Sequence, residues 1–244
     1  MNLAQVTTPQ LHHVTEGEGA AVLLLHGLLM SSRDWYKSGL VAEAAKSHRV
    51  ICPDLLAHGG SSKSADSAAY EQRNQAAGIV ALMDQMGLER AQVVGYSAGA
   101  WLALGLAKYY PERLSSLVIG GWDIINGLPS GPEGPLSFDV FLNFARRTAP
   151  HVSQWVKPED EPSLRKSFEA LWVNQDMSAA LQVLPVPILL WAGRDDIYYP
   201  SLKSYSEDTG FDLLSSEGDH VSTMLEMDSL TREHLRKFLD THSG

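Results

Sequence analysis

A five-residue segment of the sequence has the composition of a turn that displays a nucleophile. Gly-Tyr-Ser-Ala-Gly, residues 95–99, lies between two apolar runs and has Ser97 at its centre. The run before it is typical of a buried strand and the run after it of a helix. In that setting the two glycines leave room for a strained serine whose hydroxyl projects from the turn. A Gly-x-Ser-x-Gly match arises by chance in roughly one chain in ten of this length. Without suitable partners, Ser97 would be only a helix-capping serine.

The partners that a nucleophilic serine needs are a base and a carboxylate. A serine hydroxyl is a weak nucleophile until a base accepts its proton. Among nine histidines, His220 follows a strand-like run, FDLLSS, and precedes the last helical stretch. Asp195 and Asp196 come shortly after the apolar run ILLWAG, and Asp123 comes directly after LVIGGW. Asp195 and Asp196 with His220 predict a Ser-His-Asp site.

Backbone N–H groups near Ser97 could stabilise an oxyanion. The first aliphatic run, VLLL, leads into a sharp turn at His26-Gly27, followed by Leu28. We expect the N–H of Leu28 to face the same place as the N–H of Ala98. Removal of one such donor in another enzyme costs about 2.7–4 kcal/mol of transition-state stabilisation. His26 and His58 are expected to be structural.

The elements that must position these residues alternate along the chain. Short apolar runs, typical of strands buried on both faces, occur at residues 22–25, 50–51, 93–94, 117–119 and 188–191. Helical stretches follow them, at residues 32–47, 71–87, 98–113 and 220–242. This alternation predicts an α/β fold with a mostly parallel sheet flanked by helices.

The alternation is interrupted between residues 122 and 183. The segment opens with NGLPSGPEGP, whose glycines and prolines are typical of a loop. Apolar residues then recur at helical spacing in two stretches, at Phe138, Phe141, Leu142 and Ala145, and at Leu164, Phe168, Leu171 and Trp172. We expect a small helical cap at 122–183, inserted into a core domain formed by residues 1–121 and 184–244.

Aromatic residues near Ser97 and in the expected cap are candidates for substrate contacts. So short a lobe cannot easily bury all of its bulky apolar residues, and the surplus would line an apolar pocket. The candidates are Tyr96, Trp122, Phe138, Phe141, Phe144 and Trp172. The expected partner is therefore a small, largely apolar substrate.

The composition disfavours several other classes of partner. The 244 residues are 44% hydrophobic and 20% charged, with a formal net charge of −10. This balance is ordinary for a globular protein, and the negative charge disfavours nucleic acid and anionic membranes. The single cysteine, Cys52, excludes an internal disulfide and disfavours a cysteine-based metal site. No cofactor motif, metal motif, signal peptide or bilayer-spanning run is recognisable, so we expect a cytoplasmic protein without a cofactor.

Several motifs together resemble those of the α/β-hydrolase superfamily, over nearly the whole chain. LLLHGLLMSSRDW is similar to the family's His-Gly oxyanion loop, and GYSAGA is similar to its nucleophile elbow. VICPDLLAHGGSS is similar to Asp-x-x-Gly-His-Gly-x-Ser, with Ala57 in place of the first glycine. GRDDIYYP resembles Gly-x-x-Asp-x-x-x-Pro, which implies Asp196 as the acid, and GDH resembles the motif that carries His220. The chain order Ser, Asp, His is also that of the family. Some members of the family carry the acid after the preceding strand, which makes Asp123, directly after LVIGGW, a rival candidate.

The resemblance is to compact capped members: carboxylesterases, lactonases, C–C bond hydrolases and cofactor-free haloperoxidases. It implies a serine hydrolase that cleaves an ester-like bond through an acyl-enzyme on Ser97, His220 and Asp196. Cleavage of a C–C bond, a lactone or a thioester on the same residues is an alternative. A ligand-binding protein that keeps these residues with negligible turnover is an alternative of another class.

Overall fold

The computed structural model describes residues 10–131, 134–173 and 176–243. Three expectations reach beyond these ranges. The N-terminal segment without a recognisable signal peptide lies mostly outside them, as do residues 132–133 of the glycine- and proline-rich loop and residues 174–175 of the expected cap. Among the residues described, no helix combines the length and apolarity that crossing a membrane requires.

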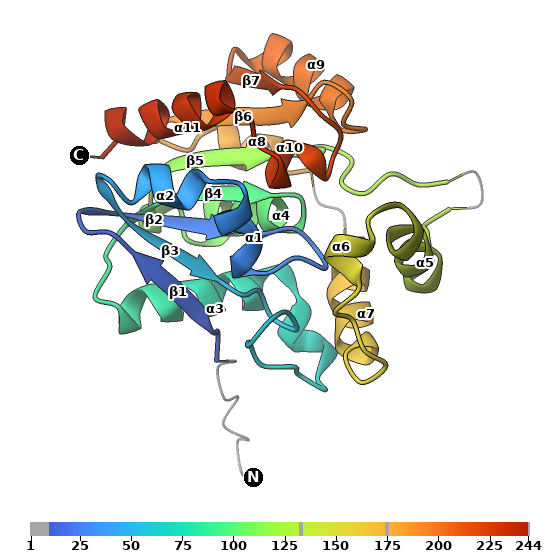
Figure 1. Ribbon diagram of the computed structural model, residues 1–244. Helices are drawn as coiled ribbons and strands as arrows, with labels where there is room; N and C mark the ends of the chain where they lie inside the picture. The colour runs from blue at the N-terminus through green and yellow to red at the C-terminus, as the bar shows by residue number, and fades with distance from the viewer. Residues whose placement is uncertain (1–9, 132–133, 174–175, 244) are drawn as a thin grey trace.

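A seven-stranded sheet in the order β1-β3-β2-β4-β5-β6-β7 forms the centre of the molecule (Figure 1). The strands are β1 (His13–Glu16), β2 (Ala20–Leu25), β3 (His48–Pro53), β4 (Ala91–Tyr96), β5 (Leu114–Gly120), β6 (Ile188–Gly193) and β7 (Asp212–Ser216). All neighbouring pairs are parallel except β1 with β3. The predicted α/β fold with a mostly parallel sheet is confirmed.

Strand β1 is not predicted by the apolar runs. It is a four-residue strand at the edge of the sheet, and none of its residues is fully buried. The central strand β4, by contrast, is buried along its whole length. A strand buried on both faces needs a continuous apolar run, whereas an edge strand does not.

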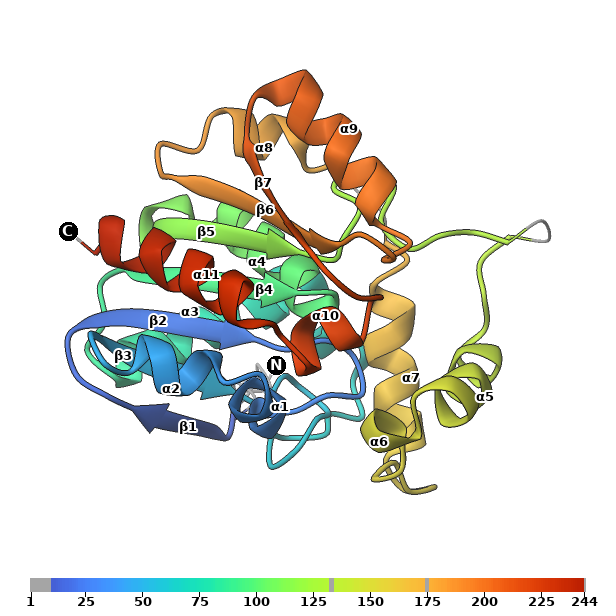
Figure 2. The same ribbon diagram turned by 45° about the horizontal axis from the view of Figure 1, so that its top comes forward.

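Helices cover both faces of the sheet (Figure 2). Along β2, Leu23 and Leu25 contribute to one hydrophobic cluster, and Val22 and Leu24 to another, because successive side chains point to opposite faces. The first cluster includes residues of α3 (Gln72–Gln85), α4 (Ala98–Tyr109), α8 (Ser178–Gln182) and α9 (Tyr199–Thr209). The second includes residues of α1 (Ser32–Lys37), α2 (Leu40–Ala44), α10 (Ser222–Leu225) and α11 (Ser229–Thr241). Two 3₁₀ turns, η1 (Ser67–Tyr70) and η2 (Pro111–Arg113), precede α3 and β5.

Two stretches expected as single helices are broken. Gly39 takes a left-handed φ of 76° between α1 and α2, a conformation that glycine adopts without strain. Between α10 and α11, the Asp228 side chain accepts a hydrogen bond from the Thr231 N–H at 2.9 Å and so caps a new helix. The prediction of continuous helices at 32–47 and 220–242 was wrong because a glycine and an aspartate end the periodic pattern locally.

Helices α5 (Phe138–Thr148), α6 (Pro150–Ser153) and α7 (Glu161–Ala170) form a lobe. Helices α5 and α7 share a third hydrophobic cluster with core residues such as Leu56 and Tyr70, whereas Val152 of α6 belongs to the second cluster. Figures 1 and 2 show this lobe beside the sheet, at the end toward which the arrows of β4, β5 and β6 point. Helix α8 lies outside the lobe, because Met177 and Leu181 are buried in the core cluster around α4. The inserted segment therefore divides into a lobe over the strand ends and a return segment that packs on the core.

Candidate active site

Ser97 occupies the turn between β4 and α4 in a strained conformation, with φ 56° and ψ −119°. A Cβ on Gly95 would lie 2.4 Å from the Gly99 carbonyl oxygen, and a Cβ on Gly99 would lie 2.0 Å from the Leu25 carbonyl oxygen. Both glycines are thus needed for steric reasons. The Ser97 N–H donates to the Gly120 carbonyl at 2.8 Å, which helps to hold this conformation.

The structure brings Ser97, His220 and Asp196 together in one chain of hydrogen bonds. His220 Nε2 lies 2.9 Å from Ser97 Oγ, and His220 Nδ1 lies 2.9 Å from Asp196 Oδ2. His220 follows β7 and Asp196 follows β6, so each side chain stands beyond the carboxyl end of a strand. An ionised Asp196 keeps the proton on Nδ1 and leaves Nε2 free to accept the Ser97 O–H. The arrangement can therefore withdraw the serine proton during attack on a carbonyl.

The two other carboxylates considered for the acid lie elsewhere. The Asp123 carboxylate accepts hydrogen bonds from the N–H groups of Ile125 and Asn126, at 3.0 and 2.8 Å, in its own turn. Asp195 is exposed and lines the cavity described below. Asp196 is 3% exposed, and its Oδ1 accepts from the Tyr198 N–H at 3.0 Å.

Tyr96 does not line the cavity, contrary to the expectation that it contacts substrate. Its side chain is fully buried, and its hydroxyl lies 3.1 Å from Asp196 Oδ2 and 2.9 Å from the His220 carbonyl oxygen. Burial and the nearby Asp196 carboxylate raise the pKa of the Tyr96 phenol, so the hydroxyl stays protonated and donates. Tyr96 therefore orients Asp196 and His220 from beneath. The residue precedes the serine along a buried strand, which points its side chain into the protein.

Two N–H groups next to Ser97 have no acceptor within the described part of the chain: those of Leu28 and Ala98. Leu28 belongs to the oxyanion loop, residues 26–29, in which Leu29 takes a left-handed φ of 63°. Gly27 lies against the serine, since a Cβ there would be 3.3 Å from Ser97 Cβ. The two free donors are thus placed by the oxyanion loop and by the first turn of α4 beside the same serine.

Two buried histidines hold the oxyanion loop in place. His58 Nε2 accepts the Leu29 N–H at 3.1 Å, and His26 Nε2 accepts the Leu55 N–H at 3.0 Å. Burial lowers the pKa of His26 and lowers that of His58 to about 3, so both imidazoles are neutral acceptors at neutral pH. Trp155 adds a bond from the lobe, because its indole N–H donates to the Leu29 carbonyl at 2.7 Å.

A cavity of about 630 Å³ opens over Ser97 between the core and the lobe. Phe141, Phe144 and Trp172, among the aromatic residues expected to contact substrate, line it. Further apolar lining comes from Leu28, Met30, Leu128, Leu136, Phe168, Leu171 and Ile197. Leu28, Met30 and Ile197 belong to the core, and Phe141, Phe144 and Phe168 belong to α5 and α7 of the lobe, so a bound molecule would be enclosed by core and lobe together.

Trp122 and Phe138 do not line the cavity, and this corrects the expectation that they contact substrate. Trp122 is 3% exposed, and its ring stacks on Tyr198 with centroids 6.0 Å apart. Phe138 is 1% exposed and packs on Phe168 at 5.8 Å, on the side of α5 that faces α7. Tyr198, which the sequence patterns did not single out, does line the cavity, and its ring lies 5.2 Å from that of His220. Its place two residues after Asp196 is the signal that could have identified it.

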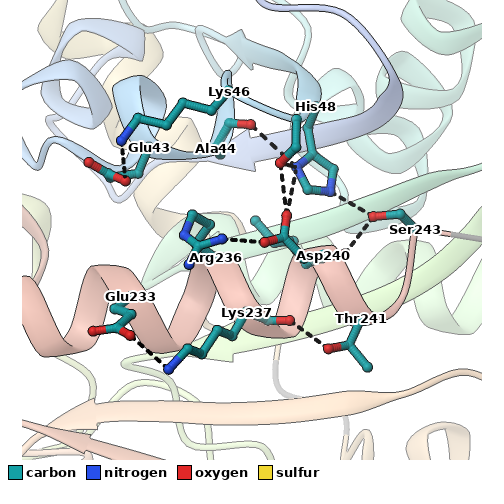
Figure 3. Close-up of polar contacts among 12 residues, drawn as sticks. Glu43, Ala44, Lys46, His48, Glu233, Arg236, Lys237, Asp240, Thr241 and Ser243 are labelled. Atoms are coloured by element: carbon teal, nitrogen blue, oxygen red, sulfur yellow. Dashed lines mark hydrogen bonds and ion pairs between the residues drawn. The ribbon is translucent and has the colours of Figure 1, made fainter.

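A serine, a histidine and an aspartate meet a second time, at the end of α11 (Figure 3). His48 Nε2 lies 2.7 Å from Ser243 Oγ, but His48 Nδ1 is 3.7 Å from Asp240 Oδ1. The Ser243 hydroxyl donates to the Leu239 carbonyl at 2.7 Å, and none of the three residues lines the cavity over Ser97. This cluster attaches the C-terminal helix to β3 and lacks the features of an active site. Among the residues described, no group of three His, Cys, Asp or Glu side chains is placed to hold a metal ion.

Comparisons with known proteins agree with this fold. A family model described as alpha/beta hydrolase fold matches residues 20–122. A 2-hydroxymuconate semialdehyde hydrolase of Pseudomonas sp. (strain CF600) is 31% identical over 207 residues, covering 75% of this chain and 73% of the relative. A 2-hydroxy-6-oxo-6-phenylhexa-2,4-dienoate hydrolase of Comamonas testosteroni is 29% identical over 220 residues, covering 78% of this chain and 76% of the relative.

Among solved structures, the enol-lactonase from Burkholderia xenovorans LB400 is similar over 97% of this chain and 99% of its own, with a TM-score of 0.79 and 19% identity. At this identity the likeness concerns the fold. The family model, the curated relatives and the shared fold lead to the same conclusion: the chain belongs to the α/β-hydrolase fold family.

Proposed function

We propose that the protein is a serine hydrolase that cleaves an ester-like bond of a small, largely apolar substrate through an acyl-enzyme. Membership of the α/β-hydrolase fold family supports hydrolase chemistry. One observation carries the finer proposal: the hydrogen-bond chain Ser97–His220–Asp196 lies at the base of a largely apolar cavity, beside two free backbone N–H groups.

The proposed reaction begins with attack of Ser97 Oγ on the substrate carbonyl while His220 Nε2 accepts the serine proton. The carbonyl oxygen becomes an oxyanion that accepts hydrogen bonds from the N–H groups of Leu28 and Ala98. Collapse breaks the bond to the leaving group, which takes the proton from His220. A water molecule then gives its proton to His220 and attacks the acyl group, releasing the acid and restoring Ser97.

C–C bond hydrolysis is a second candidate, because two curated relatives bear names of that kind. The names contain muconate and dienoate, which denote carboxylate-bearing molecules. The described cavity lining contains no lysine or arginine that could pair with a carboxylate. The ester proposal, with a lactone or thioester as variants, therefore fits this cavity better than a dienoate does.

The experiment that tests the proposal is rapid mixing with p-nitrophenyl butyrate followed by an acid quench. We expect p-nitrophenol to be released in a burst equal to the enzyme concentration, because an activated phenyl ester should acylate the serine faster than water hydrolyses the acyl-enzyme. Mass spectrometry of the digested protein should find a butyryl group on the peptide that contains Ser97.

Release no faster than in buffer, with no acylated peptide, would contradict the proposal and favour a ligand-binding protein. Turnover of 2-hydroxy-6-oxo-6-phenylhexa-2,4-dienoate faster than that of every ester tried would favour C–C hydrolysis. The ligand-binding alternative and the C–C hydrolysis alternative would thus each give a result that the ester proposal does not predict.

We also propose that α5, α6 and α7 act as the cap of this enzyme, within the broader inserted segment 122–183. The Trp155–Leu29 hydrogen bond supports this role, since it joins the lobe to the oxyanion loop. Phe141 and Trp172 line the cavity on the lobe side. Their side chains would then determine which acyl or alcohol groups fit over Ser97.

Replacement of Phe141 or Trp172 by alanine is expected to change the ranking of short, long and aromatic esters by roughly 10-fold in relative kcat/KM, because each enlarges the apolar pocket by a ring. Phosphonate labelling of Ser97 should persist. Val140→Ala is the matched control, since Val140 is on the same helix but 54% exposed and outside the cavity. An unchanged ranking in both folded variants would show that the core loops alone determine specificity.

A further inference from the structure

The cavity over Ser97 carries negative charge on one side only. Three carboxylate side chains line it, those of Asp195, Asp219 and Glu226, and none of its described lining residues is lysine or arginine. Residues 132–133 and 174–175, which the structure does not describe, are Pro-Glu and Asn-Gln in the sequence and so add no cation. The charge of the cavity wall is therefore negative at neutral pH.

All three carboxylates belong to the core side of the cavity. Asp195 precedes Asp196, Asp219 precedes His220, and Glu226 follows α10. Asp219 accepts hydrogen bonds from the N–H groups of Val221 and Ser222, at 3.0 and 2.8 Å, and these bonds lower its pKa. Negative charge thus lies directly beside the residues that would hold the scissile bond.

Asp195 and Glu226 are exposed and have no ion-pair partner in the described ranges. The nearest cations by sequence are otherwise engaged. Arg194 pairs with Glu217 at 2.7 Å. Arg147 lies over the ring of Phe144, with its guanidinium carbon 5.9 Å from the ring centroid. Neither arginine lines the cavity, so neither neutralises its wall.

A carboxylate on a substrate would lose hydration on entering this apolar space and would meet like charges with no cation to pair with. The net charge of −10 would also oppose its approach. An uncharged substrate incurs neither cost. We propose that the cavity selects uncharged esters or lactones and discriminates against substrates that carry a carboxylate on the acyl or alcohol side. This inference rests on the proposed function, since it concerns the substrate class of the same site.

The test compares two substrates of the same shape that differ in charge: mono-4-nitrophenyl adipate and its terminal amide, 4-nitrophenyl 5-carbamoylpentanoate. Measured at pH 8, kcat/KM of the amide should exceed that of the acid by roughly 10- to 100-fold. Added salt should narrow the gap, because it screens exposed charges.

The variants Asp195→Asn and Glu226→Gln should each lower the ratio of kcat/KM for the amide to kcat/KM for the acid. The double variant should lower this ratio most. Asp219 is left unchanged because its carboxylate orders the turn that carries His220. The matched control is Asp208→Asn on α9, which removes the same charge from an exposed residue outside the cavity and should leave the ratio unchanged.

A second readout does not require turnover. Two fluorophosphonates, one with a terminal carboxylate on its alkyl chain and one with the terminal amide, should label Ser97 at rates that differ in the same direction as the esters. Equal rates for the acid and amide probes, or faster reaction of the acid, would overturn the inference even if both esters are hydrolysed. Faster labelling by the amide probe would support the inference even if neither ester turns over. The absence of ester turnover would then contradict only the ester proposal. Failure of both probes to label Ser97 would overturn both.

Discussion

Replacement of Ser97 by alanine is expected to lower kcat on an uncharged p-nitrophenyl ester by roughly 10⁴–10⁶-fold, as in other enzymes whose nucleophile is removed. The melting temperature should barely change. The Ser97 N–H still donates to the Gly120 carbonyl, and alanine meets the same backbone strain at φ 56° as serine does. Only the hydroxyl, with its 2.9 Å contact to His220 Nε2, is lost. Steady-state kinetics and thermal unfolding measure the two quantities.

Labelling with a fluorophosphonate provides the direct control. The wild-type protein should be modified at Ser97 and the alanine variant should not be modified at all. Ser222 lines the same cavity, and Ser222→Ala should still be labelled at Ser97, because its hydroxyl donates to Asp219 and does not contact the His220 ring nitrogens. Modification of another serine in the wild-type protein would overturn the assignment of the nucleophile.

The sequence was most informative where chemistry requires adjacent residues. The turn around Ser97 needs a glycine on both sides, because a Cβ on Gly95 or Gly99 would collide with the backbone. This steric constraint is therefore visible in five consecutive residues of the sequence. The same holds for the buried parallel strands, whose continuous apolar runs are confirmed as a parallel sheet. Such patterns can be recognised in the sequence because the physical requirement concerns residues that are neighbours in the chain.

The rest depended on packing between segments far apart in the chain. Tyr96 looked like a cavity residue because it adjoins Ser97, yet its hydroxyl reaches Asp196, one hundred positions away. Phe138 and Phe141 share one amphipathic pattern and both pack on Phe168 of α7, with ring centroids 5.8 and 5.0 Å apart, but only Phe141 lines the cavity. Periodicity indicates that a helix has an apolar face; it cannot divide that face between a neighbouring helix and a cavity.

Replacement of Asp196 by asparagine is expected to lower kcat by roughly 10⁴-fold, the size of the loss when the same change leaves the histidine of another triad in the wrong tautomer. An asparagine amide can turn its NH₂ toward His220 Nδ1, which would shift the imidazole proton to Nε2, the atom that must accept from Ser97. The Tyr198 N–H would stabilise that orientation, because it donates at the Oδ1 position, which the amide oxygen would then occupy. The measurement is kcat on an uncharged ester, from pH 6 to 10.

Asp195→Asn and Asp123→Asn are the matched controls, since each makes the same substitution just beyond the end of a strand, β6 for Asp195 and β5 for Asp123. Both should retain most of the activity on an uncharged ester. Asp195 is exposed in the cavity wall and Asp123 closes its own turn, so neither orients His220. If Asp123→Asn were the most damaging of the three, the acid would follow β5 and not β6, and the hydrogen bond between His220 and Asp196 would not be the one that matters for turnover. Each of the three variants exchanges one carboxylate oxygen for an NH₂ group. A difference of several powers of ten in kcat between them would therefore reflect the position of the carboxylate that is replaced.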